Sequence, residues 1–278
     1  MHMKKRLLLV PVSLVVISVA APATHAESTN RDHADLVHPF VPAVSIGAER
    51  RAAPSGYVRH DGMSSPELRA RFGASGLVRC GAALGTAQLT LRADVITTAA
   101  HVLIGPDGQT RASCTFEPTI ALGSGSVAID LSTIRAGSAT PLSAPATRDW
   151  AVARLAAPIN GAIPYRLADP GRSLNGLTMC AGGNGRADRM GLEHCAARRT
   201  IRTSPDGIRE IAIDCSAAPG SSGAALLSDQ HRMVGIYVGY RSTDPDKAQP
   251  FSMTHYNFAI TVDGPFRRAL LAAASARR

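Results

Sequence analysis

The sequence predicts an all-β protein whose chain ends in a single α-helix. From Leu77 onward, short runs rich in β-branched and aromatic residues alternate with clusters of Gly, Pro, Asn and Asp, which is typical of antiparallel strands joined by turns. The one good helical pattern begins at residues 265–271, with Asp263 close to its start. A chain of 278 residues with 45% hydrophobic residues is also long enough to bury a sizeable core.

Nine segments are predicted to form the strands of this fold. Each is a short apolar or alternating run, and turn-forming residues separate it from the next. The predicted strands are residues 84–91, 95–98, 127–134, 150–155, 177–181, 210–214, 224–227, 233–240 and 256–261.

The N-terminus has the pattern of an export signal. Three basic residues at positions 4–6 precede an apolar run at residues 7–20, and small residues then offer cleavage sites. We expect a signal peptide of residues 1–26 that is cleaved after Ala26, with Ala23 as the second choice. A signal anchor is the alternative, but the apolar run is short for spanning a bilayer. We therefore expect a secreted or periplasmic protein without stable membrane insertion.

Residues 27–72 lack the alternating pattern of the rest of the chain. They contain several Pro and charged residues, and one short helix with Ser65 as its cap is expected at residues 65–71. Both a pro-segment and a disordered or surface-wrapping N-terminal arm fit this composition. His33 and His38 are not expected to bind a metal, because no cysteine or carboxylate pattern accompanies them.

The basic character of the chain does not by itself predict a nucleic-acid partner. The formal net charge is +9, but the arginines are dispersed and no basic stripe with interleaved aromatic residues occurs. A weak attraction to anionic surfaces is the simpler consequence of such a charge. We therefore expect no nucleic acid among the partners.

A serine between glycines is the most informative feature of the sequence. The stretch Gly220-Ser221-Ser222-Gly223 lies directly before the apolar run at residues 224–227. Glycines on both sides let the backbone turn sharply and expose a serine hydroxyl. The turn also leaves the backbone N–H groups of Gly220 and Ser222 free to point at a developing oxyanion. Alone, this pattern is weak, because any tight turn before a strand resembles it.

Two upstream motifs supply what such a serine needs as a nucleophile. Thr98-Ala99-Ala100-His101 ends a β-branched run, and Asp149 stands at the start of an alternating apolar strand. A serine hydroxyl needs a base that works near pH 7, which histidine provides, and a carboxylate that fixes the imidazole tautomer. Taken one at a time, the histidine could be a solvated residue, the aspartate a turn cap and the serine a turn serine.

Together these motifs resemble those of the chymotrypsin-like serine proteases. Thr98-Ala99-Ala100-His101 matches the Thr-Ala-Ala-His signature of that family, and Asp149-Trp150-Ala151-Val152 matches the start of its aspartate strand. Gly220-Ser221-Ser222-Gly223-Ala224-Ala225 matches Gly-Asp-Ser-Gly-Gly-Pro with three departures. The stretch from Asp214 to Gly223 is similar to the secreted bacterial branch related to the glutamyl endopeptidases. The resemblance covers about residues 75–275.

The resemblance implies the fold in more detail. It implies two antiparallel six-stranded β-barrels, at about residues 75–160 and 165–262, within a protease domain of residues 73–276 that includes the C-terminal α-helix. In this family the active site lies in the cleft between the barrels. The histidine and the aspartate would therefore come from the first barrel, and the serine from the second.

The resemblance also implies the activity. The chain would be a monomeric, secreted serine endopeptidase that hydrolyses protein or peptide substrates through an acyl-enzyme, without a cofactor or a metal. The catalytic residues implied are His101, Asp149 and Ser222, and the N–H groups of Gly220 and Ser222 would form the oxyanion hole. The alternative is a non-catalytic binding protein that keeps the protease fold.

The departures from the family pattern bear on activation and on substrate choice. In trypsin-type members an aspartate before the catalytic serine pairs with a new N-terminal amine, but here that position is Ser221, so this switch is expected to be absent. The family positions imply a substrate pocket formed by Ser216, Ala217, Tyr237, Val238, Gly239 and Tyr240. An aspartate at the position of Ser216 would favour substrates with Arg or Lys, but the chain has none there. The glutamyl endopeptidases have a histidine at the position of Tyr237, so a preference for Glu is not expected either. A small or apolar substrate side chain is therefore expected.

The five cysteines agree with an exported protein. The resemblance implies a disulfide between Cys80 and Cys114, across the histidine loop, and a second between Cys195 and Cys215, just before the serine turn. Cys180 would then remain unpaired. Its pairing with Cys195 is the alternative, because sequence cannot fix connectivity. A zinc site is not expected, since no Cys-x-x-Cys spacing occurs.

Overall fold

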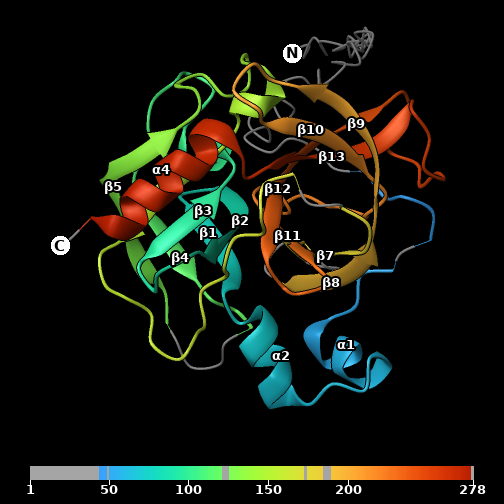
Figure 1. Ribbon diagram of the computed structural model, residues 1–278, viewed down its shortest axis with the longest axis horizontal. Coiled ribbons are helices and arrows are strands. Elements are labelled where there is room, and N and C mark those ends of the chain that lie inside the picture. The colour runs from blue at the N-terminus through green and yellow to red at the C-terminus, as the bar shows by residue number, and fades with distance from the viewer. Residues whose placement is uncertain (1–43, 49, 121–124, 172–173, 184–188, 277–278) are drawn as a thin grey trace, which may run out of the picture. The chain divides into compact units, whose positions relative to one another are not determined.

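The described part of the chain is a closed β-barrel and a second antiparallel sheet, with two helices before the barrel, two short ones between its strands and one after the second sheet (Figure 1). The structure is a computed structural model that describes residues 44–276, apart from residues 49, 121–124, 172–173 and 184–188. The expected export signal and its cleavage sites lie outside these residues, and so do His33 and His38. The described residues all belong to the compact unit Val37–Arg278.

Six strands close into the first barrel in the order β1-β2-β3-β6-β5-β4, and every neighbouring pair is antiparallel. Because β3 and β6 are neighbours that run in opposite directions, the end of β3 lies beside the start of β6. This places the residues that follow β3 next to those that precede β6. The strands are β1 (Ser75–Cys80), β2 (Ala83–Leu89), β3 (Val95–Thr98), β4 (Cys114–Glu117), β5 (Val127–Ala136) and β6 (Ala151–Leu155).

Seven strands form the second sheet in the order β8-β7-β11-β12-β13-β10-β9. Its two edge strands, β8 and β9, are separated in the chain by Ala196 alone, so the sheet must curl until its edges meet at this residue. The strand count differs from the six implied by the resemblance because one long segment is divided at Ala196. The strands are β7 (Leu177–Gly182), β8 (Met190–Cys195), β9 (Ala197–Thr203), β10 (Arg209–Ile213), β11 (Ala225–Ser228), β12 (Met233–Ser242) and β13 (His255–Thr261).

The C-terminal helix α4 (Gly264–Ser275) returns to the first barrel, where it contacts β3 and β6 (Figure 1). The rings of Trp150 and Phe266 stack there with their centroids 5.1 Å apart. At the other end of the helix, Arg92 and Arg154 donate hydrogen bonds to its last carbonyl groups. No helix within the described ranges is long and apolar enough to cross a bilayer.

Two short helices, α1 (Pro54–His60) and α2 (Ser65–Phe72), precede the first barrel. Helix α2 is the helix predicted at residues 65–71, but its cap is Ser64 rather than Ser65. Ser64 has an extended backbone, and its hydroxyl accepts a hydrogen bond from the N–H of Glu67 at 3.3 Å. This is the geometry that satisfies a free donor in the first turn of a helix. The remaining helices are α3 (Ala100–Leu103) and η1 (Ala146–Arg148).

Residues 44–48 and 50–52, called the N-terminal segment below, bridge to the second sheet and to the loop after β12. Ile46 forms a parallel bridge with Gln249, and Ala52 forms an antiparallel bridge with Leu192 in β8. The side chains of Val44 and Ile46 are buried. This part of residues 27–72 therefore contributes backbone pairing and buried apolar surface to the fold.

The two disulfides in the structure join Cys80 to Cys114 and Cys195 to Cys215, the pairs that the resemblance implied. Cys80 and Cys114 stand directly opposite each other on β1 and β4. Cys180 is a free thiol in β7, and its complete burial raises its pKa to about 12. It therefore stays protonated and behaves as a small apolar core residue.

Candidate active site

His101 and Asp149 meet where β3 ends and β6 begins. His101 lies in α3, three residues after the end of β3, and Asp149 lies between η1 and β6. The pairing of Thr98 with Ala151 holds these two segments side by side. Both side chains are buried. The barrel topology thus brings together two residues that are 48 positions apart in the sequence.

The Asp149 carboxylate holds His101 at two points. One oxygen accepts a hydrogen bond from the backbone N–H of His101 at 3.0 Å, and the other lies 2.6 Å from Nδ1. A carboxylate can only accept, so Nδ1 carries a proton and Nε2 is left with its lone pair in the neutral ring. Nε2 is buried and has no hydrogen-bond partner among the described residues. This nitrogen is therefore available as a base.

The turn that carries Ser222 depends on its glycines. Gly220 and Gly223 have φ values of +98° and +86°, a region that side chains rarely adopt. A Cβ atom added to Gly223 would lie 2.2 Å from Thr98 Oγ1 and 2.8 Å from the Ala99 nitrogen. Only glycine lets the turn come this close to the segment that leads into His101.

Thr86 in β2 fastens the same turn to the first barrel. Its N–H donates to the Ser222 carbonyl at 2.7 Å, and its hydroxyl donates to the Gly220 carbonyl at 2.6 Å. The hydroxyl also accepts the N–H of Gly182, at the end of β7, at 2.8 Å. Sequence reasoning missed Thr86, because a threonine in a strand pattern gives no sign of a role beyond strand formation.

The backbone N–H of Ser221 has a hydrogen-bond acceptor, whereas those of its neighbours Gly220 and Ser222 have none among the described residues. The Ser221 N–H donates to the Ala218 carbonyl at 2.9 Å, and its hydroxyl donates to the Gly182 carbonyl at 2.9 Å. The N–H groups of Gly220 and Ser222 have no acceptor among the described residues. Two unused amides on a turn form a place for an anionic oxygen.

Of the three predicted catalytic residues, two are in direct contact and the third is held near them by its backbone. His101 and Asp149 are directly hydrogen-bonded. Ser222 is brought to the same end of the first barrel by backbone contacts to Thr86, and the neighbouring Gly223 packs against Thr98. No hydrogen bond joins the Ser222 hydroxyl to His101 in the part of the chain that the structure describes.

Ser216 and Ala217 of the predicted substrate pocket are buried and contact the N-terminal segment. The Ser216 hydroxyl lies 3.2 Å from the Ile46 nitrogen and 3.4 Å from the Ile46 carbonyl oxygen. The Ala217 N–H donates to the Val44 carbonyl at 3.1 Å. The loop before the serine turn is thus held in place by a segment that the sequence did not connect with it.

The other predicted pocket residues lie on β12. This strand pairs with β11 only as far as Ile236, and a bulge at Val238 interrupts its pairing with β13. Beyond Ile236, the edge of β12 away from β13 has no partner strand among the described residues. Val238, Gly239 and Tyr240 therefore present a strand edge that could pair with an extended peptide.

Tyr237, the remaining predicted pocket residue on β12, has its side chain in a different environment from this strand edge. Its side chain is buried in the core of the second sheet, and its hydroxyl donates to Asn257 Oδ1 at 3.2 Å. Burial raises the pKa of the phenol, so it stays neutral. The same Asn257 binds the backbone of Val44 through both its oxygen and its nitrogen.

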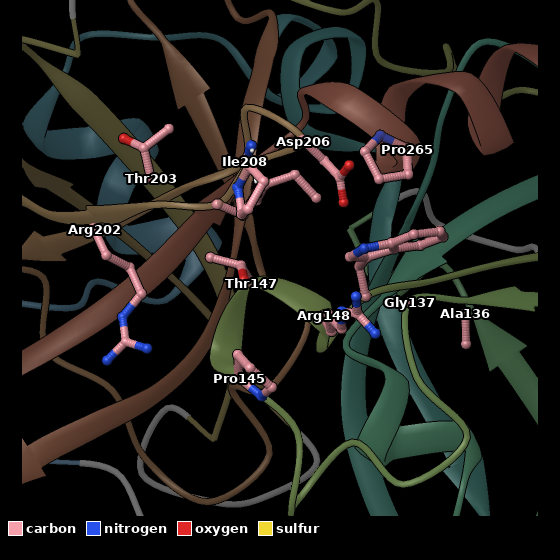
Figure 2. A pocket seen from close by; sticks show the side chains of 13 residues that line it. Ala136, Gly137, Pro145, Thr147, Arg148, Arg202, Thr203, Asp206, Ile208 and Pro265 are labelled. Atoms are coloured by element: carbon pink, nitrogen blue, oxygen red, sulfur yellow. Dashed lines mark hydrogen bonds between the residues drawn. The ribbon is translucent and has the colours of Figure 1, made fainter.

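A groove of about 890 Å³ lies beside this site, and none of the three predicted catalytic residues lines it. Figure 2 shows side chains from the segment before β6, such as Arg148, and from the β9–β10 turn, such as Asp206. Arg148 and Trp150 line the groove, whereas Asp149 between them does not. In the described ranges, no group of three or more His, Cys, Asp or Glu side chains could hold a metal ion.

A comparison with known protein families identifies the family of this chain. Residues 85–236 match the family model described as "Trypsin-like peptidase domain". The chain belongs to this trypsin-like peptidase family. Among curated proteins, none matches the sequence significantly.

Solved structures show the same fold at low sequence identity. A Glu endopeptidase is 14% identical, with a TM-score of 0.60, over 84% of this chain and 100% of its own. The thermostable serine protease AL20 from an extremophilic microorganism is 15% identical, with a TM-score of 0.55, over 74% of this chain and 99% of its own. The protease Anisep from Arthrobacter nicotinovorans is 13% identical, with a TM-score of 0.52, over 74% and 96% of the two chains.

Proposed function

We propose that this trypsin-like peptidase is an exported serine endopeptidase with a triad of Ser222, His101 and Asp149. The observation that carries the proposal is the imidazole of His101, which Asp149 holds by Nδ1 and by the backbone while Nε2 remains unpartnered. A buried nitrogen with no partner is costly unless it has a use. Transfer of a proton from the nearby serine would be that use.

The proposed reaction passes through an acyl-enzyme. His101 Nε2 takes the proton of the Ser222 hydroxyl as its oxygen attacks a peptide carbonyl, and the oxyanion binds the N–H groups of Gly220 and Ser222. His101 then gives the proton to the leaving amine, and water repeats the sequence to release the acid. Asp149 keeps the proton of Nδ1 in place and stabilises the imidazolium.

Export and a protein substrate complete the proposal. Two disulfides in a chain of this size fit an oxidising compartment. A peptidase acts on proteins or peptides, and the free edge of β12 is suited to bind an extended chain. The expected leader at residues 1–26 would direct the export.

Labelling with a fluorophosphonate probe tests the proposal. The wild-type protein should gain one label, which peptide mapping should place on Ser222, and it should hydrolyse casein. Ser222→Ala should lose the label and lower turnover by several orders of magnitude. Ser221→Ala is the matched control and should keep the label, because its hydroxyl already binds Gly182.

A folded protein that takes no label and cleaves no casein would overturn the proposal. That result would favour the alternative, a binding protein that keeps the protease fold. A label on Ser221 would instead show that the nucleophile was assigned one residue too late.

A further inference from the structure

A groove of about 570 Å³ lies beside the C-terminal helix, and none of the three predicted catalytic residues lines it. Its walls include three separate parts of the chain. The connection from β6 to β7 contributes Arg166, the turn before β12 contributes Arg232, and helix α4 contributes Arg267. The fold thus brings three arginines from distant positions in the sequence to one place, called the basic groove below.

The basic groove carries positive charge that the fold does not neutralise. Within the part of the chain that the structure describes, Arg166, Arg232 and Arg267 form no ion pair with a carboxylate. Arg267 donates a hydrogen bond to the Ala168 carbonyl at 2.8 Å, which is an uncharged acceptor. Asp169 is the one acidic residue of the lining, so three formal positive charges face one negative charge. The basic groove therefore suits an anionic partner.

Two arginines at the other end of α4 show the difference. Arg92 and Arg154 donate to the last carbonyl groups of this helix, and both also form an ion pair with Asp94. Their charges are thus compensated inside the fold, where they hold the helix in place. The arginines of the basic groove have no such carboxylate, so helix packing does not account for their charge.

Exposed apolar side chains accompany these arginines. Ile163 and Leu271 line the basic groove, and they are 62% and 46% exposed. They are two of the four large apolar residues that are exposed among the described residues. Exposed apolar side chains that gather at one place mark an interaction site. The partner therefore offers apolar groups as well as anionic ones.

The backbone of residues 165–167 along the basic groove is already paired. Tyr165 forms a parallel bridge with Thr90, and Leu167 forms one with Met233. Between them, the Arg166 carbonyl accepts the Met233 N–H at 2.8 Å. A peptide that binds as an added strand needs a free edge of N–H and C=O groups, which this segment does not offer. Recognition is left to the guanidinium groups and the exposed apolar side chains.

A phospholipid surface combines the two kinds of group that such side chains bind. Guanidinium groups bind phosphate oxygens in pairs, and apolar side chains beside them enter the boundary between headgroups and acyl chains. We propose that the basic groove docks the protein on the surface of a membrane that contains anionic phospholipid. Arg166, Arg232 and Arg267 bind headgroup phosphates, and Ile163 and Leu271 enter the boundary. This inference does not depend on the proposed catalytic triad.

Co-sedimentation with lipid vesicles tests the proposal. The chain without its expected export signal, residues 27–278, is mixed with vesicles of phosphatidylcholine alone or with one third phosphatidylglycerol. The wild type should bind the vesicles that contain phosphatidylglycerol and not the others. Arg166→Gln/Arg232→Gln should lower the partition coefficient roughly 25-fold, because each arginine near an anionic surface contributes about fivefold. Ile163→Ser should lower it about fivefold without a change in charge.

Arg79→Gln/Arg199→Gln is the matched control. Both arginines are exposed, form no ion pair in the described ranges and lie outside the lining of the basic groove. Their replacement removes the same two charges, yet the control should bind the vesicles as the wild type does. An equal loss in the control would overturn the proposal, because the attraction of a chain with a net charge of +9 would then be diffuse.

Three other results would overturn the proposal as well. The first is a wild type that does not bind vesicles with phosphatidylglycerol. The second is wild-type binding in either groove variant, once circular dichroism shows that the variant is folded. The third is binding to immobilised polyglutamate that is tighter than binding to vesicles and is lost in Arg166→Gln/Arg232→Gln, because the groove would then take an acidic polypeptide. If the arginine variant does not fold, Ile163→Ser still decides the proposal, since this exposed side chain is not needed for the core.

Discussion

Thr86 shows at the residue scale how backbone contacts hold a candidate nucleophile. Its hydroxyl and its N–H bind the carbonyls of Gly220 and Ser222, on either side of Ser221. The same hydroxyl accepts an N–H from Gly182, so it acts both as a donor and as an acceptor. A buried side chain of the first barrel thus fixes a turn of the second sheet.

Replacement of Thr86 by the isosteric valine should impair both stability and turnover. Thr86→Val leaves the Gly220 carbonyl and the Gly182 N–H without a partner, which should cost about 1–3 kcal/mol for a buried polar group. A shifted turn should also lower kcat by about tenfold or more. Urea unfolding and peptide hydrolysis measure the two effects.

Thr86→Ser is the matched control, because it keeps the hydroxyl and loses only a methyl group. It should recover most of the kcat of the wild type. A wild-type kcat in Thr86→Val would show that the turn keeps its place without these hydrogen bonds.

At the scale of elements, strands with a strong apolar pattern were predictable and strands defined by their neighbours were not. All nine predicted strands form, as β2, β3, β5, β6, β7, β10, β11, β12 and β13. The strands that were missed are β1, β4, β8 and β9. β4 has only four residues, and β9 carries arginines on exposed positions. Such segments become strands because adjacent strands offer hydrogen bonds, which composition does not reveal.

Helix α2 contacts the second sheet through a titratable residue, His231. Its Nε2 lies 3.2 Å from an Arg71 guanidinium nitrogen, and its ring stacks on Phe72 with centroids 5.4 Å apart. Burial, and then the charge of Arg71, lower the pKa of His231, whereas Asp229 opposes them. The folded protein therefore favours the neutral ring.

This shift predicts a pH dependence of stability. The unfolded chain takes up the proton first, at about pH 6.5. The contribution of His231 is thus complete above that pH and is lost as the pH falls toward the lower folded pKa. Between pH 7.5 and 5.5, the free energy of unfolding should fall further in the wild type than in His231→Gln. Urea titrations at both pH values measure the difference, and equal decreases in the two proteins would contradict the prediction.

At the scale of the whole molecule, the N-terminal segment is part of the second sheet. It binds Ser216 and Ala217, bridges to Gln249 and Leu192, and buries Val44 and Ile46. The sequence left residues 27–72 open as a pro-segment or an arm. The contacts show what the described part of that stretch does in this fold.

Removal of this segment should destabilise the protein. A chain that begins at Ser64 lacks Val44 and Ile46, and burial of two such side chains contributes about 3–6 kcal/mol. Its free energy of unfolding should fall by at least about 3 kcal/mol relative to a chain that begins at residue 40. Both chains lack the expected export signal, so the comparison isolates residues 40–63, which comprise this segment and helix α1 with its buried Tyr57. Equal urea midpoints would show that the segment contributes no stability.

The sequence alone predicted the fold class and the family, both of which are confirmed, and it named three candidate catalytic residues. Short β-branched runs, turn-forming clusters and the three motifs around His101, Asp149 and Ser222 are local features, and they can be recognised without coordinates. The disulfide pairs followed only from the resemblance, and the structure contains them.

Only the tertiary structure decided which distant residues support the site. Thr86 lies 136 residues before Ser222, whose carbonyl accepts its N–H, and Glu193 accepts the N–H of Ser216, 23 residues later in the chain. Their roles come from hydrogen bonds across segments that no local pattern links. A threonine or a glutamate looks like an ordinary strand or surface residue in the sequence, until burial requires its polar atoms to find partners in distant segments.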